Sequence, residues 1–159
     1  MRNELNFWVV GGDMRQAKLA ELLSADGHTV HTFALEALGP LEGVRQEKYL
    51  AEAELADCVV LPLPAAGEDG MLNAPLSRHP LPLAELFSSL RPGQVVCAGR
   101  VDAPAMVQAE GLGLTLCDYF AREELAVANA VPTALAKGHH RLSTVYQLRC
   151  RSRSFFKVV

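Results

Sequence analysis

The stretch FWVVGGDMRQAKLAELLSADGHTV, residues 7–30, decides the fold. An apolar run ends in two glycines, and the residues that follow repeat apolar side chains with helical spacing as far as Gly27. Asp13 stands where a carboxylate can cap the first turn of that helix. A second apolar run, Thr29 to Phe33, completes a strand, helix and strand. Such a unit joins two parallel strands by a right-handed crossover.

The rest of the chain repeats this alternation. We predict further strands at 58–61, 94–98 and 114–116, and helices at 83–90 and from Asp102 or Ala103 to about Glu110. A loop rich in glycine and proline separates the third strand from the next helix. Because the strands are almost wholly apolar, the sheet should be parallel and covered on both faces. The expected fold is therefore α/β, with three layers and a Rossmann-like parallel sheet of about five strands.

Composition limits the class of protein. The chain has 159 residues, half of them apolar, which is enough for one core. It has no apolar run long enough to span a bilayer and no secretory signal, so we expect a cytoplasmic protein without membrane contacts. Cys58, Cys97 and Cys117 lie within or beside apolar runs and lack metal-ligand spacing. These positions favour reduced thiols over disulfides or zinc ligands, and we expect no metal site.

Charge is distributed unevenly along the chain. Residues 1–134 hold all 18 acidic and nine of the 15 basic residues, a formal charge of −9, whereas residues 135–159 carry six basic residues, or +6. An acidic body makes nucleic-acid binding unfavourable, because phosphate contacts require clustered cations. The basic tail could bind RNA or an acidic surface, but a solvated helix face is the favoured interpretation.

The first turn does not match a dinucleotide fingerprint. That fingerprint places glycine at its first, third and sixth positions, so that a diphosphate can approach the backbone. Counted from Gly11, this chain has Asp13 and Gln16 at the third and sixth positions. A carboxylate repels a diphosphate, and Gln16 adds bulk where the helix should approach the strand. What remains is a helix N-terminus beside Arg15, which suits a small carboxylate better.

Four segments resemble the N-terminal domain of the dipicolinate synthase A subunit. They are GGDMRQ (11–16), LPLPAAGEDG (61–70), CAG (97–99) and YFAREELAVANAVPT (119–133), in the family's order and spacing. The resemblance covers roughly residues 5–134. It implies a flavodoxin-like sheet similar to the substrate domain of 2-hydroxyacid dehydrogenases. It also implies an NADP-dependent oxidation of a dihydropyridine dicarboxylate to dipicolinate in sporulating bacteria, together with a flavoprotein-like B subunit.

In that family the glycine fingerprint for NADP lies in a second domain. After Thr133 this chain departs from the family pattern, and its last residues contain no such fingerprint. We therefore expect residues 1–134 to form the substrate-side domain and residues 135–159 to be an atypical basic tail, helical in part. One explanation is a frameshift near Ala136. We expect no cofactor site in this chain and no dehydrogenase activity from it alone, since hydride transfer requires a bound nicotinamide.

The expected substrate site lies at the carboxyl ends of the strands, where parallel sheets gather their ligand-binding loops. A dicarboxylate needs cations or amide donors, and Arg15 and Arg100 carry fork-shaped donors. The alternative is that Asp13 only caps the helix and that both arginines are solvated. Arg15 matches the family turn, whereas Arg100 departs from it. The predicted substrate-binding residues are Gly12, Asp13, Arg15, Gln16, Gly67, Gly99, Arg100, Asn129, Pro132 and Thr133.

Several of these residues also have simpler interpretations. Gly67 and Gly70 bracket two acidic residues in a loop that could close over a ligand, although a plain acidic turn is slightly favoured. The resemblance places Asn129, Pro132 and Thr133 at a hinge toward the second domain. His28 and His31 are expected to be structural. No residue stands out as a general base, so catalytic residues stay unassigned.

Two other classes of function compete with the substrate domain. One is a noncatalytic binding or assembly module that pairs with itself or with a B subunit. A domain without its partner exposes apolar surface, so we also expect a homo-oligomer. The other is a flavodoxin or receiver domain, which is disfavoured because the chain has neither a phosphate loop rich in Ser and Thr nor an acidic pair after its first strand.

Overall fold

The computed structural model describes residues 4–121. They form one parallel sheet with the strand order β3-β2-β1-β4-β5-β6. The strands are β1 (Asn6–Val10), β2 (Thr29–Phe33), β3 (Arg45–Gln46), β4 (Cys58–Val60), β5 (Val95–Ala98) and β6 (Thr115–Asp118). The α-helices are α1 (Met14–Ala25), α2 (Leu83–Ser88) and α3 (Ala103–Gly111), and the 3-10 helices are η1 (Glu36–Leu38), η2 (Ala53–Leu55) and η3 (Tyr119–Ala121).

This architecture confirms the predicted α/β fold with a parallel sheet and helices on both faces. The prediction of about five strands missed one, because the described sheet has six. The additional strand, β3, has two exposed residues and extends the sheet by pairing with His31 and Thr32 of β2. A strand this short and polar has no apolar pattern by which a sequence could reveal it.

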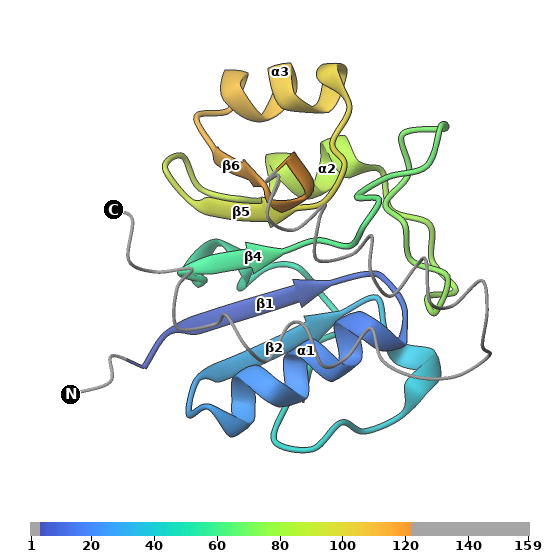
Figure 1. Cartoon of the computed structure of the whole chain (residues 1–159), viewed down its shortest axis with the longest axis vertical. Coiled ribbons are helices and arrows are strands. Elements are labelled where there is room, and N and C mark those ends of the chain that lie inside the picture. The colour runs from blue at the N-terminus through green and yellow to red at the C-terminus, as the bar shows by residue number, and fades with distance from the viewer. Residues whose placement is uncertain (1–3, 122–159) are drawn as a thin grey trace, which may run out of the picture.

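Side chains that alternate along a strand pack into two core layers, one on each face of the sheet. Trp8 and Val10 of β1 belong to the larger core cluster, which also contains residues of α2 and α3. Phe7 and Val9 point to the opposite face, into a cluster with Ala20 of α1. Because successive strand residues face opposite sides, β1 joins both cores. Figure 1 shows α1 lying across the half of the sheet that contains β1 and β2.

The first helix begins and ends as predicted. The carboxylate of Asp13 accepts a hydrogen bond from the backbone N–H of Arg15 and so caps the N-terminus. Beyond the other end of α1, Gly27 has a φ of +91°, a backbone conformation that residues other than glycine rarely adopt. These local signals explain why the limits of α1 could be located from the sequence.

The strand order reverses at β1, and this determines where a ligand can lie. The chain passes from β1 outward to β2 and β3, then returns to β4 on the other side of β1. The loops that follow β1 and β4 therefore leave in opposite directions, and such a switch point is the usual ligand crevice of open α/β sheets. Figure 1 shows the arrows of β1 and β4 pointing toward the same side, where the green loop after β4 emerges.

In the described part of the chain, no helix combines the length and apolar character needed to cross a membrane.

Candidate functional site

We expected four segments, 11–16, 64–70, 99–100 and 129–133, to converge at the carboxyl edge of the sheet, and the first three meet there. The Gly12 N–H donates to the Asn73 carbonyl oxygen at 2.8 Å, which joins the turn after β1 to the loop after β4. The Gly99 N–H donates to the Pro62 carbonyl oxygen at 3.2 Å, and the Gly99 carbonyl accepts from the Ala65 N–H at 2.9 Å. These bonds fasten the turn after β5 to the same loop. The fourth segment, 129–133, lies outside the described residues.

The turn after β1 requires glycine at Gly12. Its φ is +88°, and a Cβ atom built there would overlap Cγ of Gln16 and lie 3.1 Å from Cβ of Pro62. A larger residue would therefore be strained by its backbone conformation and by the lack of space. As a result, the end of β1 approaches the end of β4 closely.

Arg15 makes a two-pronged ion pair with Asp13. Its Nε lies 3.0 Å from Oδ1 and 3.1 Å from Oδ2, and its Nη2 lies 2.9 Å from Oδ2. Nη2 is also 3.5 Å from the carbonyl oxygen of Leu63. The side chains are 49% and 42% exposed, so the pair lies at the surface. Hydrogen bonds from Arg15 lower the pKa of Asp13, which keeps its carboxylate ionised.

Gln16, the next residue, is 7% exposed. Its Cβ and Cγ lie over Gly12, between the turn after β1 and the end of β4. Among the residues that the structure describes, its side-chain amide has no hydrogen-bond partner. Among the described residues, the fully buried side-chain polar atoms without a partner are Asn6 Oδ1 and Trp8 Nε1, so the Gln16 amide keeps some contact with solvent.

Gly99 and Tyr119 are in close contact at the same edge. A Cβ atom on Gly99 would lie 2.7 Å from Cζ of Tyr119, so only glycine lets the ring approach. The Tyr119 hydroxyl donates to the Leu61 carbonyl oxygen at 3.2 Å. Burial raises the pKa of Tyr119, and its phenol therefore stays protonated and able to donate at neutral pH.

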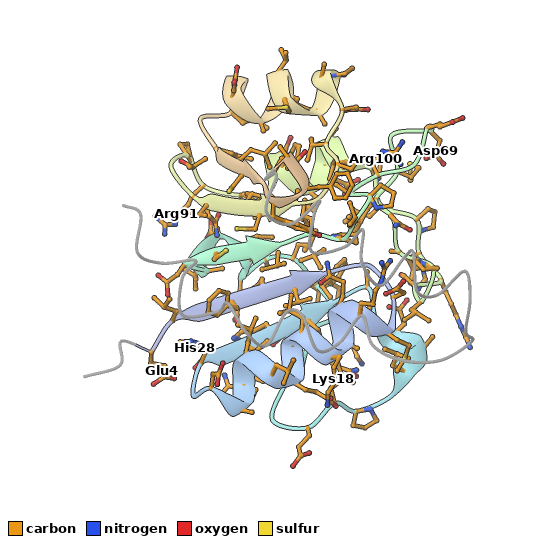
Figure 2. The ribbon with its side chains drawn as sticks, viewed as in Figure 1. Glu4, Lys18, His28, Asp69, Arg91 and Arg100 are labelled. Atoms are coloured by element: carbon orange, nitrogen blue, oxygen red, sulfur yellow. The ribbon has the colours of Figure 1, made fainter. Side chains whose placement is uncertain are left out.

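Arg100 is exposed and has a φ of +54°, which is uncommon for a residue with a side chain. Asp118 holds it there, because the Asp118 carboxylate accepts the N–H groups of Arg100 at 3.1 Å and Val101 at 3.0 Å. The guanidinium makes no hydrogen bond or ion pair within residues 4–121. It borders a shallow hollow that Leu83 and Ala105 also line. Figure 2 shows Arg100 at this edge and His28 at the opposite end.

Gly67 lies in a small turn that makes its own hydrogen bonds. Its N–H donates to the Met71 carbonyl oxygen at 2.9 Å, and the Asp69 carboxylate accepts from the Met71 N–H at 3.0 Å. These contacts account for an ordered acidic turn without a ligand. Whether Gly67 takes part in binding stays a prediction.

The remaining predictions fall elsewhere. Asn129, Pro132, Thr133 and the tail 135–159 lie outside the described residues. His28 accepts from the Leu5 N–H at 3.3 Å, and His31 stacks on Trp8 with ring centroids 5.2 Å apart. Both histidines thus make structural contacts away from the carboxyl edge.

The three described cysteines are not disulfide-bonded. Cys58 is buried, whereas Cys97 and Cys117 are half-buried. Hydrogen bonding to Cys97 and burial raise the pKa of the Cys58 thiol, so it stays protonated and unreactive at neutral pH. Within residues 4–121, no group of three or more potential ligand side chains is arranged to hold a metal ion.

Three residues that organise the edge were not predicted from the sequence. Asn73 accepts the Gly12 N–H, and its side-chain amide donates to the Pro64 carbonyl oxygen at 3.1 Å. Asp118 and Tyr119 fix the turn after β5 from the end of β6. The signal available for Asp118 was an acidic residue that ends an apolar strand, but its partners are distant in sequence. The carboxyl edge as a whole therefore places two groups that can bind a small anion near each other, the Arg15 guanidinium and the Gln16 side-chain amide.

Comparisons with known proteins point to one family. A family model described as the N-terminal domain of the dipicolinate synthase A subunit matches residues 6–120. No curated protein shows significant similarity to the chain. Among solved structures, the dipicolinate synthase A chain from Bacillus subtilis is 21% identical, with a TM-score of 0.71 over 90% of this chain and 51% of that one. The dipicolinate synthase A subunit from Bacillus halodurans is also 21% identical, with a TM-score of 0.73 over 89% and 52%.

Identity at this level shows the shared fold alone. The chain spans about half the length of these two solved proteins, 51% and 52%.

Proposed function

Because the chain belongs to the family of N-terminal domains of the dipicolinate synthase A subunit, we propose that it binds a small dicarboxylate at the carboxyl edge of its sheet. It would serve as the substrate-side domain in the oxidation of dihydrodipicolinate to dipicolinate, in the cytoplasm of a sporulating cell. The observation that carries this proposal is the position of Arg15. Its guanidinium lies at the switch point between β1 and β4, within 3.5 Å of the Leu63 carbonyl oxygen.

The chemistry of the edge fits a carboxylate better than a diphosphate. A guanidinium can bind both oxygens of one carboxylate at once. The Asp13 carboxylate stands in the first turn of α1, where it would repel the two negative phosphates of a dinucleotide. Gln16 fills the space beside Gly12 that a fingerprint glycine would leave open for close helix packing.

Oxidation requires a nicotinamide held against the substrate, and we propose that NADP is held by a second domain rather than by this one. This chain alone would then bind the dicarboxylate without oxidising it. A B subunit is a further proposed partner of the complete enzyme.

Isothermal titration calorimetry with dipicolinate and with NADP tests this proposal. We expect weak dipicolinate binding and no NADP binding. Arg15→Gln should weaken dipicolinate binding by about 1.5–3 kcal/mol, roughly ten- to hundredfold, because a charge-assisted hydrogen bond is lost. Lys18→Gln is the matched control, since Lys18 is a cation of the same helix that pairs with Glu21 at 2.9 Å. Tight NADP binding, or equal losses in the two variants, would contradict the proposal.

A noncatalytic assembly module is the second candidate. It is favoured by the outer face of α3, where Met106 is 39% and Val107 is 68% exposed beside the edge strand β6. Exposed apolar side chains beside the edge strand of a sheet tend to promote association, and β6 is an edge strand of the sheet formed by residues 4–121. Light scattering after size-exclusion chromatography distinguishes this candidate. If a dimer forms and Val107→Glu disrupts it while dipicolinate does not bind at all, assembly is the better conclusion.

A further inference from the structure

Arg15 already binds a carboxylate, and that carboxylate belongs to the chain itself. Asp13 occupies Nε and Nη2 of the guanidinium with three contacts of 2.9–3.1 Å. This is the two-pronged geometry in which arginine binds a carboxylate ligand. As long as Asp13 holds this position, those two donors are not available to a substrate.

The pair is well placed for exchange. Both side chains are about half exposed, at 49% and 42%. Exposed ion pairs contribute little to stability, because water solvates the separated charges almost as well. Asp13 also has a second role, since its Oδ1 accepts the N–H of Arg15 at 2.9 Å and so caps α1. That cap can remain while the guanidinium turns to another anion.

A second group that can bind a ligand lies at this turn. As a residue Gln16 is more than nine-tenths buried, and its side-chain amide has no hydrogen-bond partner among the described residues; because this amide is not one of the fully buried unpartnered groups, it can be reached from solvent. It lies over Gly12, one residue from Arg15. A side-chain amide offers two N–H donors, which a carboxylate can accept. A ligand carboxylate at this position would take the place of water as the acceptor of this amide.

We propose that Asp13 is an internal stand-in for a substrate carboxylate, and that a dicarboxylate binds by displacing Asp13 from Arg15 and accepting a hydrogen bond from Gln16. This inference rests on the proposed function, and it adds that the Asp13 carboxylate competes with the substrate for Arg15. Asp13 makes the site selective. A ligand gains binding free energy from Arg15 only if its carboxylate binds the guanidinium more strongly than the Asp13 carboxylate does.

Calorimetric titration of dipicolinate into a set of full-chain variants tests the displacement. Asp13→Asn keeps a good helix cap but removes the charged competitor. We expect it to bind dipicolinate about two- to fivefold more tightly than the wild type. The gain should vanish in the Arg15→Gln background, where there is no guanidinium to release. Gln16→Met, which keeps the side-chain volume, should bind about three- to tenfold more weakly.

The matched control is Asp102→Asn. Asp102 caps α3 at the same edge, through the Ala105 N–H at 2.9 Å, and carries the same charge. A general electrostatic effect would tighten binding equally in both Asp→Asn variants, and that result would overturn the displacement. Unchanged or weaker binding by Asp13→Asn, or a gain that persists without Arg15, would also overturn it. If neither the wild type nor any variant binds dipicolinate, the proposed function itself fails.

Discussion

Gly99 and Tyr119 directly follow the neighbouring strands β5 and β6, and they fit together only because Gly99 has no side chain. The Tyr119 ring lies so close to Gly99 that a Cβ atom there would be 2.7 Å from Cζ. The same tyrosine donates to the Leu61 carbonyl oxygen at 3.2 Å. The contact therefore ties the ends of β4, β5 and β6 together, and it determines how the loops of the candidate site meet.

Gly99→Ala should force Tyr119 out of this position. We expect a loss of about 1–3 kcal/mol in the free energy of unfolding, because the added methyl group overpacks the contact. Urea unfolding followed by circular dichroism measures the change. In the Gly99→Ala background, Tyr119→Ala should cost at least about 1 kcal/mol less than it does in the wild type. Additive losses in the double variant would show that the two residues do not interact in this way.

Gln94 is a buried residue whose loss should be costly. It is 1% exposed, and its Nε2 donates to the carbonyl oxygens of Ala53 at 2.7 Å and Ala56 at 2.8 Å. Gln94→Leu removes both donated hydrogen bonds from this buried site and leaves the Ala53 carbonyl with the Ala56 N–H, so we expect a loss of about 1–3 kcal/mol in urea unfolding. Ser88→Ala, which removes an exposed hydroxyl, should change stability by less than about 0.5 kcal/mol. Similar small effects in both variants would refute this role.

Glu36 fastens η1 to the loop after β4. Its Oε1 accepts the Ser77 hydroxyl at 2.8 Å and the Arg78 N–H at 2.9 Å. Partial burial raises the pKa of Glu36, but these hydrogen bonds and the one from its own N–H outweigh burial and lower the pKa overall. Glu36→Ala should speed hydrogen exchange of the Arg78 amide about fivefold, which corresponds to about 1 kcal/mol. Exchange at the Ala20 amide in α1 is the internal control, and acceleration at both sites would indicate global destabilisation instead.

Asp13 should give the fold part of its acid sensitivity. Hydrogen bonds from Arg15 lower the pKa of Asp13 below its unfolded value. The stabilisation is therefore fully present above the ordinary aspartate pKa of about 3.9, and it is lost as the pH falls through the lower folded value. We expect the urea midpoint to fall less between pH 7 and pH 3 in Asp13→Asn than in the wild type. Some decrease should remain, because the pKa of Glu36 is also lowered. An identical decrease in both proteins would contradict the ion pair.

The sequence predicted the elements whose signals are local. The limits of β1 and β2 follow from apolar runs bounded by glycine and polar residues, and α1 from the Asp13 cap. In contrast, β3 is a strand only because Arg45 and Gln46 pair with β2, and neither residue is apolar. Strand identity of this kind depends on a distant partner and cannot be inferred from the strand alone.

The candidate site was predictable in position but not in its contacts. Parallel topology places the loops after β1, β4 and β5 at one edge, so Arg15 and Gly99 could be assigned to it. The contacts Asn73–Gly12, Tyr119–Leu61 and Asp118–Arg100 join residues 61, 58 and 18 positions apart, and no local pattern encodes them. The Asp13 carboxylate was predicted as a helix cap, but its two-pronged contact with Arg15 emerged only from the structure.

Chemical-shift mapping by NMR with dipicolinate tests the central claim most directly, namely that a small dicarboxylate binds where β1 meets α1. We predict that saturating dipicolinate shifts the backbone amides of Gly12, Arg15 and Gln16, together with the side-chain amide of Gln16. Glu4 and His28, at the opposite end of the sheet, should not move (Figure 2). The absence of shifts at Gly12 to Gln16, or shifts concentrated around His28, would contradict the claim.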